Sequence, residues 1–341
     1  MSTDREPPAP ETEQTGRAST ITVLVAFAAN LAVAVAKTVA AVLTGSAGMV
    51  AEAAHSWSDT GNQVFLLVAE RKARLRPDES HPLGYGREAY VWSLFAAMGL
   101  FVAGGVVSIY HGISQLTSSE PTRHFAVGYV VLAVALCFES GSLLQALRQA
   151  RREARERGRN LIGHALTTSN PTLRAVLAED SVAVLGILVV AVGMVLHSAT
   201  GYGQYDALAS IVVGLLLCGA ALVLIDRNRR FLAGQVADPV VMTAAAERVR
   251  AMPEVALLTY LRLEFIGPRQ LLLVASVDLT GDRPESEVAR TLRRLEAELE
   301  RDPTITEAVL TLSMPGDRAI LTPHEQHGTE DAAHPSAASS R

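Results

Sequence analysis

The stretch AEAAHSWSDTGNQ, from Ala51 to Gln63, interrupts a long apolar run. A charged side chain at the middle of a bilayer costs at least about 2.5–3.5 kcal/mol on insertion scales, so the interruption needs a reason. Its polar side chains recur every three or four residues and therefore share one face of a helix, here called the polar stripe. They are Glu52, His55, Asp59 and Asn62. The polar stripe must point into a protein interior or a water-filled cavity, because lipid cannot solvate it.

The composition around this stretch is typical of a membrane domain followed by a water-facing domain. The chain has 341 residues, of which 49% are hydrophobic and 19% are charged. Soluble domains average about 25% charged residues. The charges concentrate in a short head and in the last third of the chain, and the middle is apolar. The net charge of −5 gives no sign of a nucleic-acid partner, and we expect none.

Six apolar runs follow one another with short links, and each has the roughly 20 residues that cross a bilayer as a helix. We therefore expect a six-helix transmembrane domain. The runs are Thr20–Leu43, Ala47–Ala69, Tyr90–Leu116, Phe125–Leu147, Leu173–Leu196 and Tyr205–Ile225. Lys and Arg concentrate in the links after the second and fourth runs and at the end of the sixth, which places both termini in the cytosol.

The last third of the chain has the pattern of a small water-facing α+β domain. We expect a helix first, then two strands, an amphipathic helix and a third strand. This is the order αββαβ of a ferredoxin-like domain. The first and last residues have compositions typical of disorder. The expected organisation is a disordered head at 1–19, the transmembrane domain at 20–230, the cytosolic domain at 235–316 and a disordered tail at 317–341.

A second acidic pair, Glu179 and Asp180, lies in the fifth apolar run. If the second and fifth helices pack together, His55, Asp59 and Asp180 can converge. Two carboxylates and an imidazole suit a divalent cation, zinc first, with manganese, iron, cobalt and cadmium as alternatives. Histidine titrates near neutral pH, so protons and metal compete for the same atoms. The sequence therefore predicts a transport site at which metal moves one way and protons the other.

Other polar side chains in the apolar runs have more than one interpretation. Glu52 either orients His55 from beside it or forms a hydrogen bond at a helix contact. Glu139 and Lys37 could form a proton path or an ion pair. For Lys37, its place near the outer end of the first run favours extension toward the membrane interface. Asp206 is expected to cap the sixth helix.

The segments SAGMVAEAAHSWSDTGNQ and, further on, PDESHPLGYGRE resemble the cation diffusion facilitator family. The stretches LAEDSVAVLG, QYDALAS and VSIYHGI look most like its zinc transporter nine branch. The resemblance covers about residues 20–315 and implies a homodimeric antiporter that exports a divalent cation from the cytosol. By position, His55 and Asp59 match the family's second-span ligands and Asp180 matches its fifth-span aspartate.

Departures from the family pattern leave a fourth ligand open. Most relatives have His or Asp four residues before the fifth-span aspartate, where this chain has Val176. Glu179, Asn62 or water must therefore stand in.

The resemblance also implies regulatory metal sites, and these match less well. Asp78 and His81 match a cytosolic loop site of some members, but Tyr85 stands where another histidine would be. The αββαβ domain has no histidine, so we expect it to serve dimerisation rather than metal binding.

The leading hypothesis is a proton-coupled exporter of a divalent metal ion, zinc first, with no permanently bound cofactor. Its expected partners are the metal, protons, the lipid bilayer and a second copy of the chain. Its membrane would be the plasma (inner) membrane if the chain is bacterial. A non-transporting membrane metal sensor or scaffold that signals through the cytosolic domain stays open as an alternative. We do not expect an enzyme, since the HExxH and GxSxG motifs are missing from the sequence.

Overall fold

The computed structural model describes residues 11–117, 123–156, 160–163, 168–314 and 316–320, with side chains from Phe27 onward except that of Glu156. The chain divides into two compact units, each with its own apolar core. The first unit, here called the bundle, comprises Met1–Val68, Trp92–Thr168 and Thr172–Arg227. The second comprises Ala69–Val91, Ser169–Pro171 and Asn228–Arg341.

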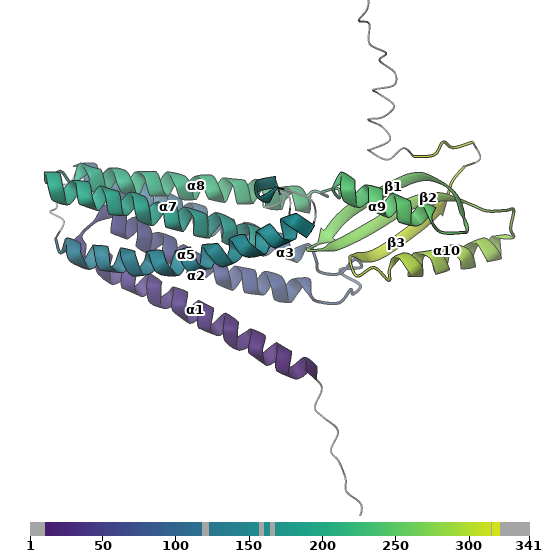
Figure 1. The fold of residues 1–341 in the computed structure, drawn as a ribbon, viewed down its shortest axis with the longest axis horizontal. Coiled ribbons are helices and arrows are strands. Elements are labelled where there is room, and N and C mark those ends of the chain that lie inside the picture. Colours follow the sequence, from purple (N-terminus) through teal and green to yellow (C-terminus); the bar gives the residue numbers. More distant parts are fainter. Residues whose placement is uncertain (1–10, 118–122, 157–159, 164–167, 315, 321–341) are drawn as a thin grey trace, which may run out of the picture. The chain divides into compact units, whose positions relative to one another are not determined.

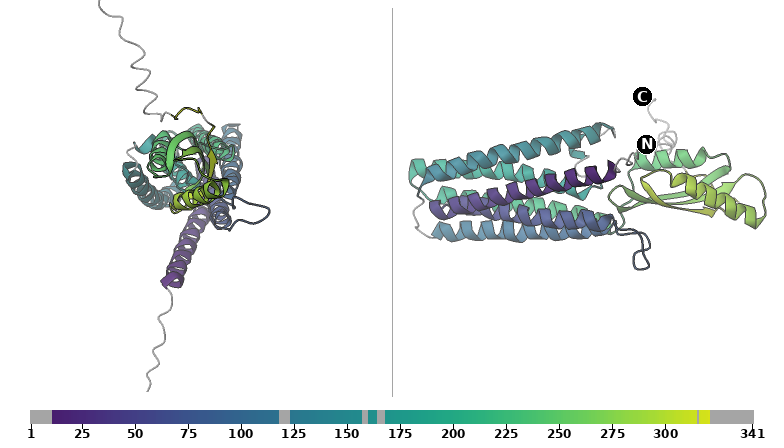
Figure 2. Two further views of the ribbon diagram at one scale, coloured as in Figure 1. Left: turned by 90° about the vertical axis from the view of Figure 1, so that its right-hand side faces the viewer. Right: turned by 90° about the horizontal axis from the view of Figure 1, so that it is seen from below.

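Long helices make up the bundle, and α2, α5, α7 and α8 run side by side (Figures 1 and 2). The helix α3 continues through a π-helical segment, η1, into α4, so these three form one span. The bounds are α1 Glu11–Thr44, α2 Ala47–Ala73, α3 Glu88–Gly99, η1 Leu100–Val106, α4 Val107–Thr117, α5 Phe125–Glu156, α7 Pro171–Thr200 and α8 Gln204–Leu232.

Five helical segments of the described chain are long and apolar enough to cross a membrane. They are Phe27–Thr44, Glu88–Thr117, Phe125–Arg155, Pro171–Thr200 and Gln204–Leu232. The sixth expected span, α2, has 27 residues and so has the required length. It is not among the five, because its polar stripe interrupts the apolar run. Ala51 and Leu66 of α2 nevertheless lie in the apolar core of the bundle.

Glycines permit a close helix contact in the bundle, between η1 and α8. A Cβ added at Gly105 would lie 2.4 Å from the Sγ of Cys218, and one added at Gly214 would lie 2.8 Å from the carbonyl oxygen of Gly105. Larger side chains would separate the two helices, so small residues are what permits this packing in a membrane domain.

The last part of the second unit, residues 235–320, is here called the tail domain, and it has the expected αββαβ order. Its three-stranded sheet has the order β1-β2-β3, with β1 antiparallel to β2 and β2 parallel to β3. The elements are α9 Pro239–Arg250, β1 Val255–Gly267, β2 Gln270–Leu279, α10 Glu285–Leu299 and β3 Ile305–Leu312. The prediction of a helical membrane domain followed by an α+β domain is confirmed.

Alternation along the strands gives the tail domain its core. In β2, Leu271, Leu273 and every second residue after them are buried, as expected for a sheet covered on one face. Buried side chains of both α9 and α10, among them Val249 and Leu295, lie in the same apolar cluster. Both helices therefore cover the same face of the sheet.

The link between α2 and α3 belongs to the second unit and is attached to the tail domain. Arg87 forms an ion pair of 2.9 Å with Glu264 of β1. The ring of Tyr90 stacks on that of Phe231 with centroids 4.9 Å apart.

At two predicted boundaries the structure has regular or ordered residues beyond the expected limits. The helix α1 begins at Glu11, so residues 11–19 are helical rather than disordered, which fits a segment of Glu, Gln, Arg and Ala without proline. Residues 317–320 are also ordered, because the backbone N–H of Ile320 donates a hydrogen bond to the carbonyl oxygen of Leu258 at 2.9 Å. Residues 1–10 and 321–341, expected to be disordered, lie outside the described residues.

Candidate functional site

The start of α2, the helix that carries the polar stripe, is held by an aspartate of α8. The carboxylate of Asp206 accepts hydrogen bonds from the Ser46 hydroxyl at 2.7 Å, from the Ala47 N–H at 2.7 Å and from the Gly48 N–H at 3.3 Å. The first backbone N–H groups of a helix have no partner within the helix. A negatively charged carboxylate at that end also interacts favourably with the positive end of the helix dipole. The prediction that Asp206 caps its own helix is therefore wrong: it caps α2, about 160 residues earlier in the chain.

The helices α2 and α7 are antiparallel neighbours. Near the start of α2, a Cβ added at Gly48 would lie 2.7 Å from a methyl carbon of Val190. Further along α2, 14 residues after Gly48, the side-chain amide of Asn62 donates a hydrogen bond to Glu179 of α7. Contacts that advance along α2 thus move backward along α7, which brings the polar stripe against the acidic pair of α7.

This register places the predicted ligands Asp59 and Asp180 at similar depth, because each lies within one turn of the contact between Asn62 and Glu179. Their carboxylates have different neighbours. Asp59 Oδ1 lies 3.4 Å from His55 Nδ1. Asp180 Oδ2 instead accepts a hydrogen bond of 2.6 Å from the Ser142 hydroxyl of α5.

The predicted ligand set is thus assembled in part. His55 and Asp59 meet, whereas the carboxylate of Asp180 is turned to α5. Across the residues that the structure describes, no group of three or more His, Cys, Asp or Glu side chains is arranged to hold a metal ion. The three-ligand site of His55, Asp59 and Asp180 stays a prediction.

Several polar atoms of the stripe are buried without a hydrogen-bond partner among the described residues. Both ring nitrogens of His55 are in this state, and so are Asp59 Oδ1, Asn62 Oδ1 and Glu52 Oε1. Buried polar groups in native proteins are nearly always paired, and unpaired ones call for an explanation such as an ion or a functional role. Their concentration on one face of one helix fits the binding of a cation by nitrogen and oxygen donors.

A second polar cluster joins α1, α2 and α5. Lys37 Nζ lies 2.8 Å from Glu52 Oε2 and 3.9 Å from Glu139 Oε1. Lys37 and Glu52 are both fully buried. The prediction that Lys37 extends to the membrane interface is therefore wrong, because Glu52 provides an opposite charge in the interior. Of the two interpretations of Glu52, the helix contact is the one observed.

The cytosolic loop residues Asp78 and His81 form a self-contained turn. Asp78 accepts hydrogen bonds from the Tyr85 hydroxyl at 2.6 Å and the Ser80 hydroxyl at 2.7 Å. Both bonds lower the pKa of Asp78, and the bond to Asp78 raises the pKa of Tyr85. The His81 ring stacks on the Tyr85 ring with centroids 3.8 Å apart. The Tyr85 hydroxyl is thus hydrogen-bonded to the Asp78 carboxylate, which a metal ion would need as a ligand. This geometry favours a structural turn over a metal site.

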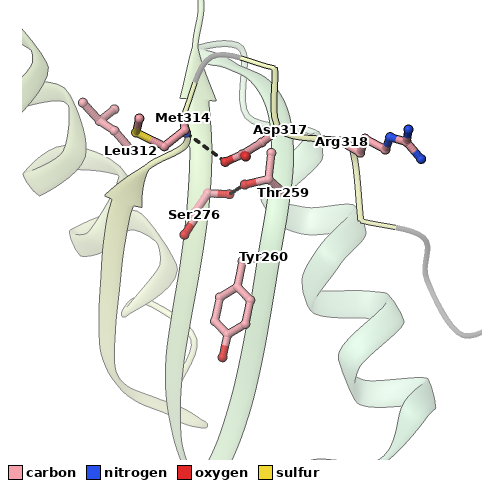
Figure 3. A pocket seen from close by; sticks show the side chains of 7 residues that line it. All are labelled: Thr259, Tyr260, Ser276, Leu312, Met314, Asp317 and Arg318. Carbon is pink, nitrogen blue, oxygen red and sulfur yellow. Dashed lines mark hydrogen bonds between the residues drawn. The ribbon is translucent and has the colours of Figure 1, made fainter.

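The tail domain has a shallow groove of about 480 Å³ on its sheet (Figure 3). Its one carboxylate, Asp317, accepts a hydrogen bond of 2.9 Å from the Met314 N–H. The groove offers no imidazole and no thiolate, and residues 235–316 contain neither His nor Cys. Its donors do not suit zinc. The lining residues are Thr259, Tyr260, Ser276, Leu312, Met314, Asp317 and Arg318.

Comparison with known families identifies the bundle. The family described as the cation efflux transmembrane domain matches residues 23–233, which is more than half of the chain and includes the polar stripe and the acidic pair. This chain belongs to the cation efflux family. The chain is accordingly a multi-pass integral membrane protein of a transporter family, not of an enzyme family.

Relatives of this cation efflux protein include several named proteins. It is 35% identical over 245 residues to the proton-coupled zinc antiporter SLC30A9, mitochondrial, of Mus musculus and of Homo sapiens, which is 72% of this chain and 43% of the relative. It is 34% identical over 233 residues to metal tolerance protein C4 of Arabidopsis thaliana, which is 68% of this chain and 51% of the relative. The chain thus spans about half or less of the length of these relatives.

Proposed function

We propose that this protein exports a divalent metal ion, zinc first, from the cytosol in exchange for protons. The observation that carries the proposal is that the polar stripe of α2, several of whose buried atoms have no hydrogen-bond partner among the described residues, lies against the acidic pair of α7. In a cation efflux protein, such a stripe has the donors and the burial that a dehydrated cation requires. The name of the SLC30A9 relatives, proton-coupled zinc antiporter, supports zinc and protons as the exchanged ions.

The proposed ligands are His55, Asp59 and Asp180. Two carboxylates and a divalent cation sum to no net charge, which removes most of the cost of burying them. For Asp180 to join the site, its carboxylate must leave the Ser142 hydroxyl and turn toward α2. Ser142 would then hold the ligand away from the site in the metal-free state, and breaking this single hydrogen bond to a carboxylate costs about 1.5–3 kcal/mol.

Protons would replace the metal on the same atoms. A protonated carboxyl or imidazole cannot bind a cation through that atom, so metal and protons exclude one another. This exclusion is what an exchanger needs, since each ion drives release of the other. Lys37 is held in its ion pair with Glu52, so Glu139 is the proposed route for protons. Glu179 or Asn62 is the proposed source of a fourth ligand.

The proposal includes the orientation and assembly of the chain. Both termini face the cytosol, as the basic residues of every second link indicate. The membrane would be the plasma (inner) membrane in a bacterium. The protein would act as a homodimer through the tail domain, whose sheet leaves one face uncovered by α9 and α10.

A vesicle flux assay tests the proposed function. The full chain is purified, inserted into lipid vesicles with a zinc-sensitive dye inside, and given an outward proton gradient, with manganese, iron, cobalt and cadmium assayed in parallel. Zinc uptake that depends on the gradient is expected. Metal binding at equilibrium without flux would instead favour the alternative of a membrane metal sensor.

A further inference from the structure

The ion pair between Lys37 and Glu52 is the part of the bundle whose role the transport site does not explain. Both side chains are fully buried, and Lys37 Nζ lies 2.8 Å from Glu52 Oε2. Buried lysines are rare, and a buried ion pair seldom adds net stability over well-packed apolar residues. A charged pair in the middle of a membrane bundle therefore calls for a functional reason.

Glu52 lies beside the proposed site and has a free oxygen. It precedes His55 by three residues on α2, a spacing that brings Cβ atoms within about 5–6 Å. Its second oxygen, Oε1, is buried and has no hydrogen-bond partner among the described residues. That oxygen faces α7, since a Cβ added at Gly186 would lie 2.9 Å from it. Glu52 is thus a carboxylate placed between the two helices of the site, with one oxygen held by Lys37.

We infer that Lys37 is a specificity-determining residue that holds Glu52 out of the transport site. This inference rests on the proposed function. Without Lys37, the Glu52 carboxylate would be free to join His55 and Asp59 as an additional oxygen ligand. Three carboxylates would then face the divalent cation. The added negative charge would bind the metal more tightly and slow its release. An added oxygen donor also shifts preference from zinc toward harder ions such as manganese.

Glu139 supports the position of Lys37 from the other side. Its Oε1 lies 3.9 Å from Lys37 Nζ. An ammonium group has three donors and no acceptor, so it is held best between several oxygens. Lys37 thus stays between α2 and α5 whether or not metal is bound.

The test compares Lys37→Met with Lys37→Arg in full-length protein in vesicles, with zinc and manganese as probes. Lys37→Met is expected to lower the KM for zinc and the maximal rate by about tenfold each, and to raise uptake of manganese relative to zinc. Lys37→Arg keeps the cation and is expected to restore the wild-type ratio. Adding Glu52→Gln to Lys37→Met removes the freed carboxylate and is expected to reverse both effects.

Equilibrium binding of zinc and manganese to the purified proteins gives a second measurement that needs no flux. Lys37→Met with the KM and the metal preference of the wild type overturns the inference. A double variant that behaves like Lys37→Met overturns it as well, because Glu52 is then not the cause. Loss of zinc binding in the double variant shows that Glu52 is an ordinary ligand, which also overturns it. Failure of the proposed function is seen separately, as wild-type protein that carries no zinc.

Discussion

The bundle and the tail domain bury different kinds of side chain. The bundle buries charged and polar groups, among them Lys37, Glu52, His55 and Asp206. In the described part of the tail domain, Thr291 is the one buried polar residue, and the charged side chains form pairs at the surface. Apolar burial is sufficient for a stable fold. Each buried charge of the bundle therefore needs a specific reason, either a structural one, as for the Asp206 cap of α2, or a functional one, because stability alone would favour apolar residues in its place.

The largest expected effect comes from removing the two aspartates of the proposed site. Asp59→Ala and Asp180→Ala should each lower zinc flux at least about 100-fold, since even residues behind the ligands cost 10–100-fold in metal sites. The measurement is gradient-driven zinc uptake in vesicles.

Glu70→Gln is the matched control, because Glu70 lies on the same helix with its side chain exposed. It should keep wild-type flux. Wild-type rates in both aspartate variants would show that the buried stripe is not the transport site.

Removing an apolar core residue of the tail domain should act on stability. Leu273 of β2 is fully buried, so Leu273→Ala should cost about 2–5 kcal/mol of unfolding free energy. Val274 points to the uncovered face of the sheet, and Val274→Ala should cost less. Hydrogen exchange of the tail-domain amides measures both. Equal losses would mean that the uncovered face is as well packed as the core.

Removing the cap of α2 tests whether a buried polar group of the bundle can be structural. Asp206→Ala leaves the Ser46 hydroxyl and two N–H groups without their acceptor, and should cost about 1–2 kcal/mol. Thermal unfolding in detergent is the measurement. Asp206→Asn keeps an acceptor and should lose less. A stable Asp206→Ala protein without flux would place Asp206 in the transport mechanism.

The smallest effect is expected from a surface carboxylate of the tail domain. Hydrogen bonds from Thr304 and the nearby Arg248 lower the pKa of Asp302 below its ordinary value near 3.8. A depressed folded-state pKa gives stability that is complete above the unfolded value and is lost as the pH falls through the folded value. Tail-domain stability should therefore fall below about pH 4, and less so in Asp302→Asn. If the stability of the Asp302→Asn variant depends on pH as that of the wild type does, Asp302 is not the cause of the loss.

Much of the fold follows from local patterns in the chain. Runs of about 20 apolar residues predict the long helices, and the switch from helical to alternating spacing after residue 235 predicts the αββαβ order. The polar stripe is equally local, because His55 and Asp59 share a face of α2 through the helical repeat alone. Their contact of 3.4 Å needs no other part of the molecule.

The pairings of the buried charges depended on which helices pack together. Three hydrogen bonds join residues that are distant in the sequence. Their separations are 15 residues for Lys37 and Glu52, 38 for Ser142 and Asp180, and 160 for Ser46 and Asp206. Helical periodicity shows which face of each helix is polar, but it does not show which neighbour that face meets or at what depth. The sequence by itself therefore determined the helices, the tail domain and the stripe. Only the tertiary structure decided the partner of each charge, because those contacts join segments that are distant in the chain.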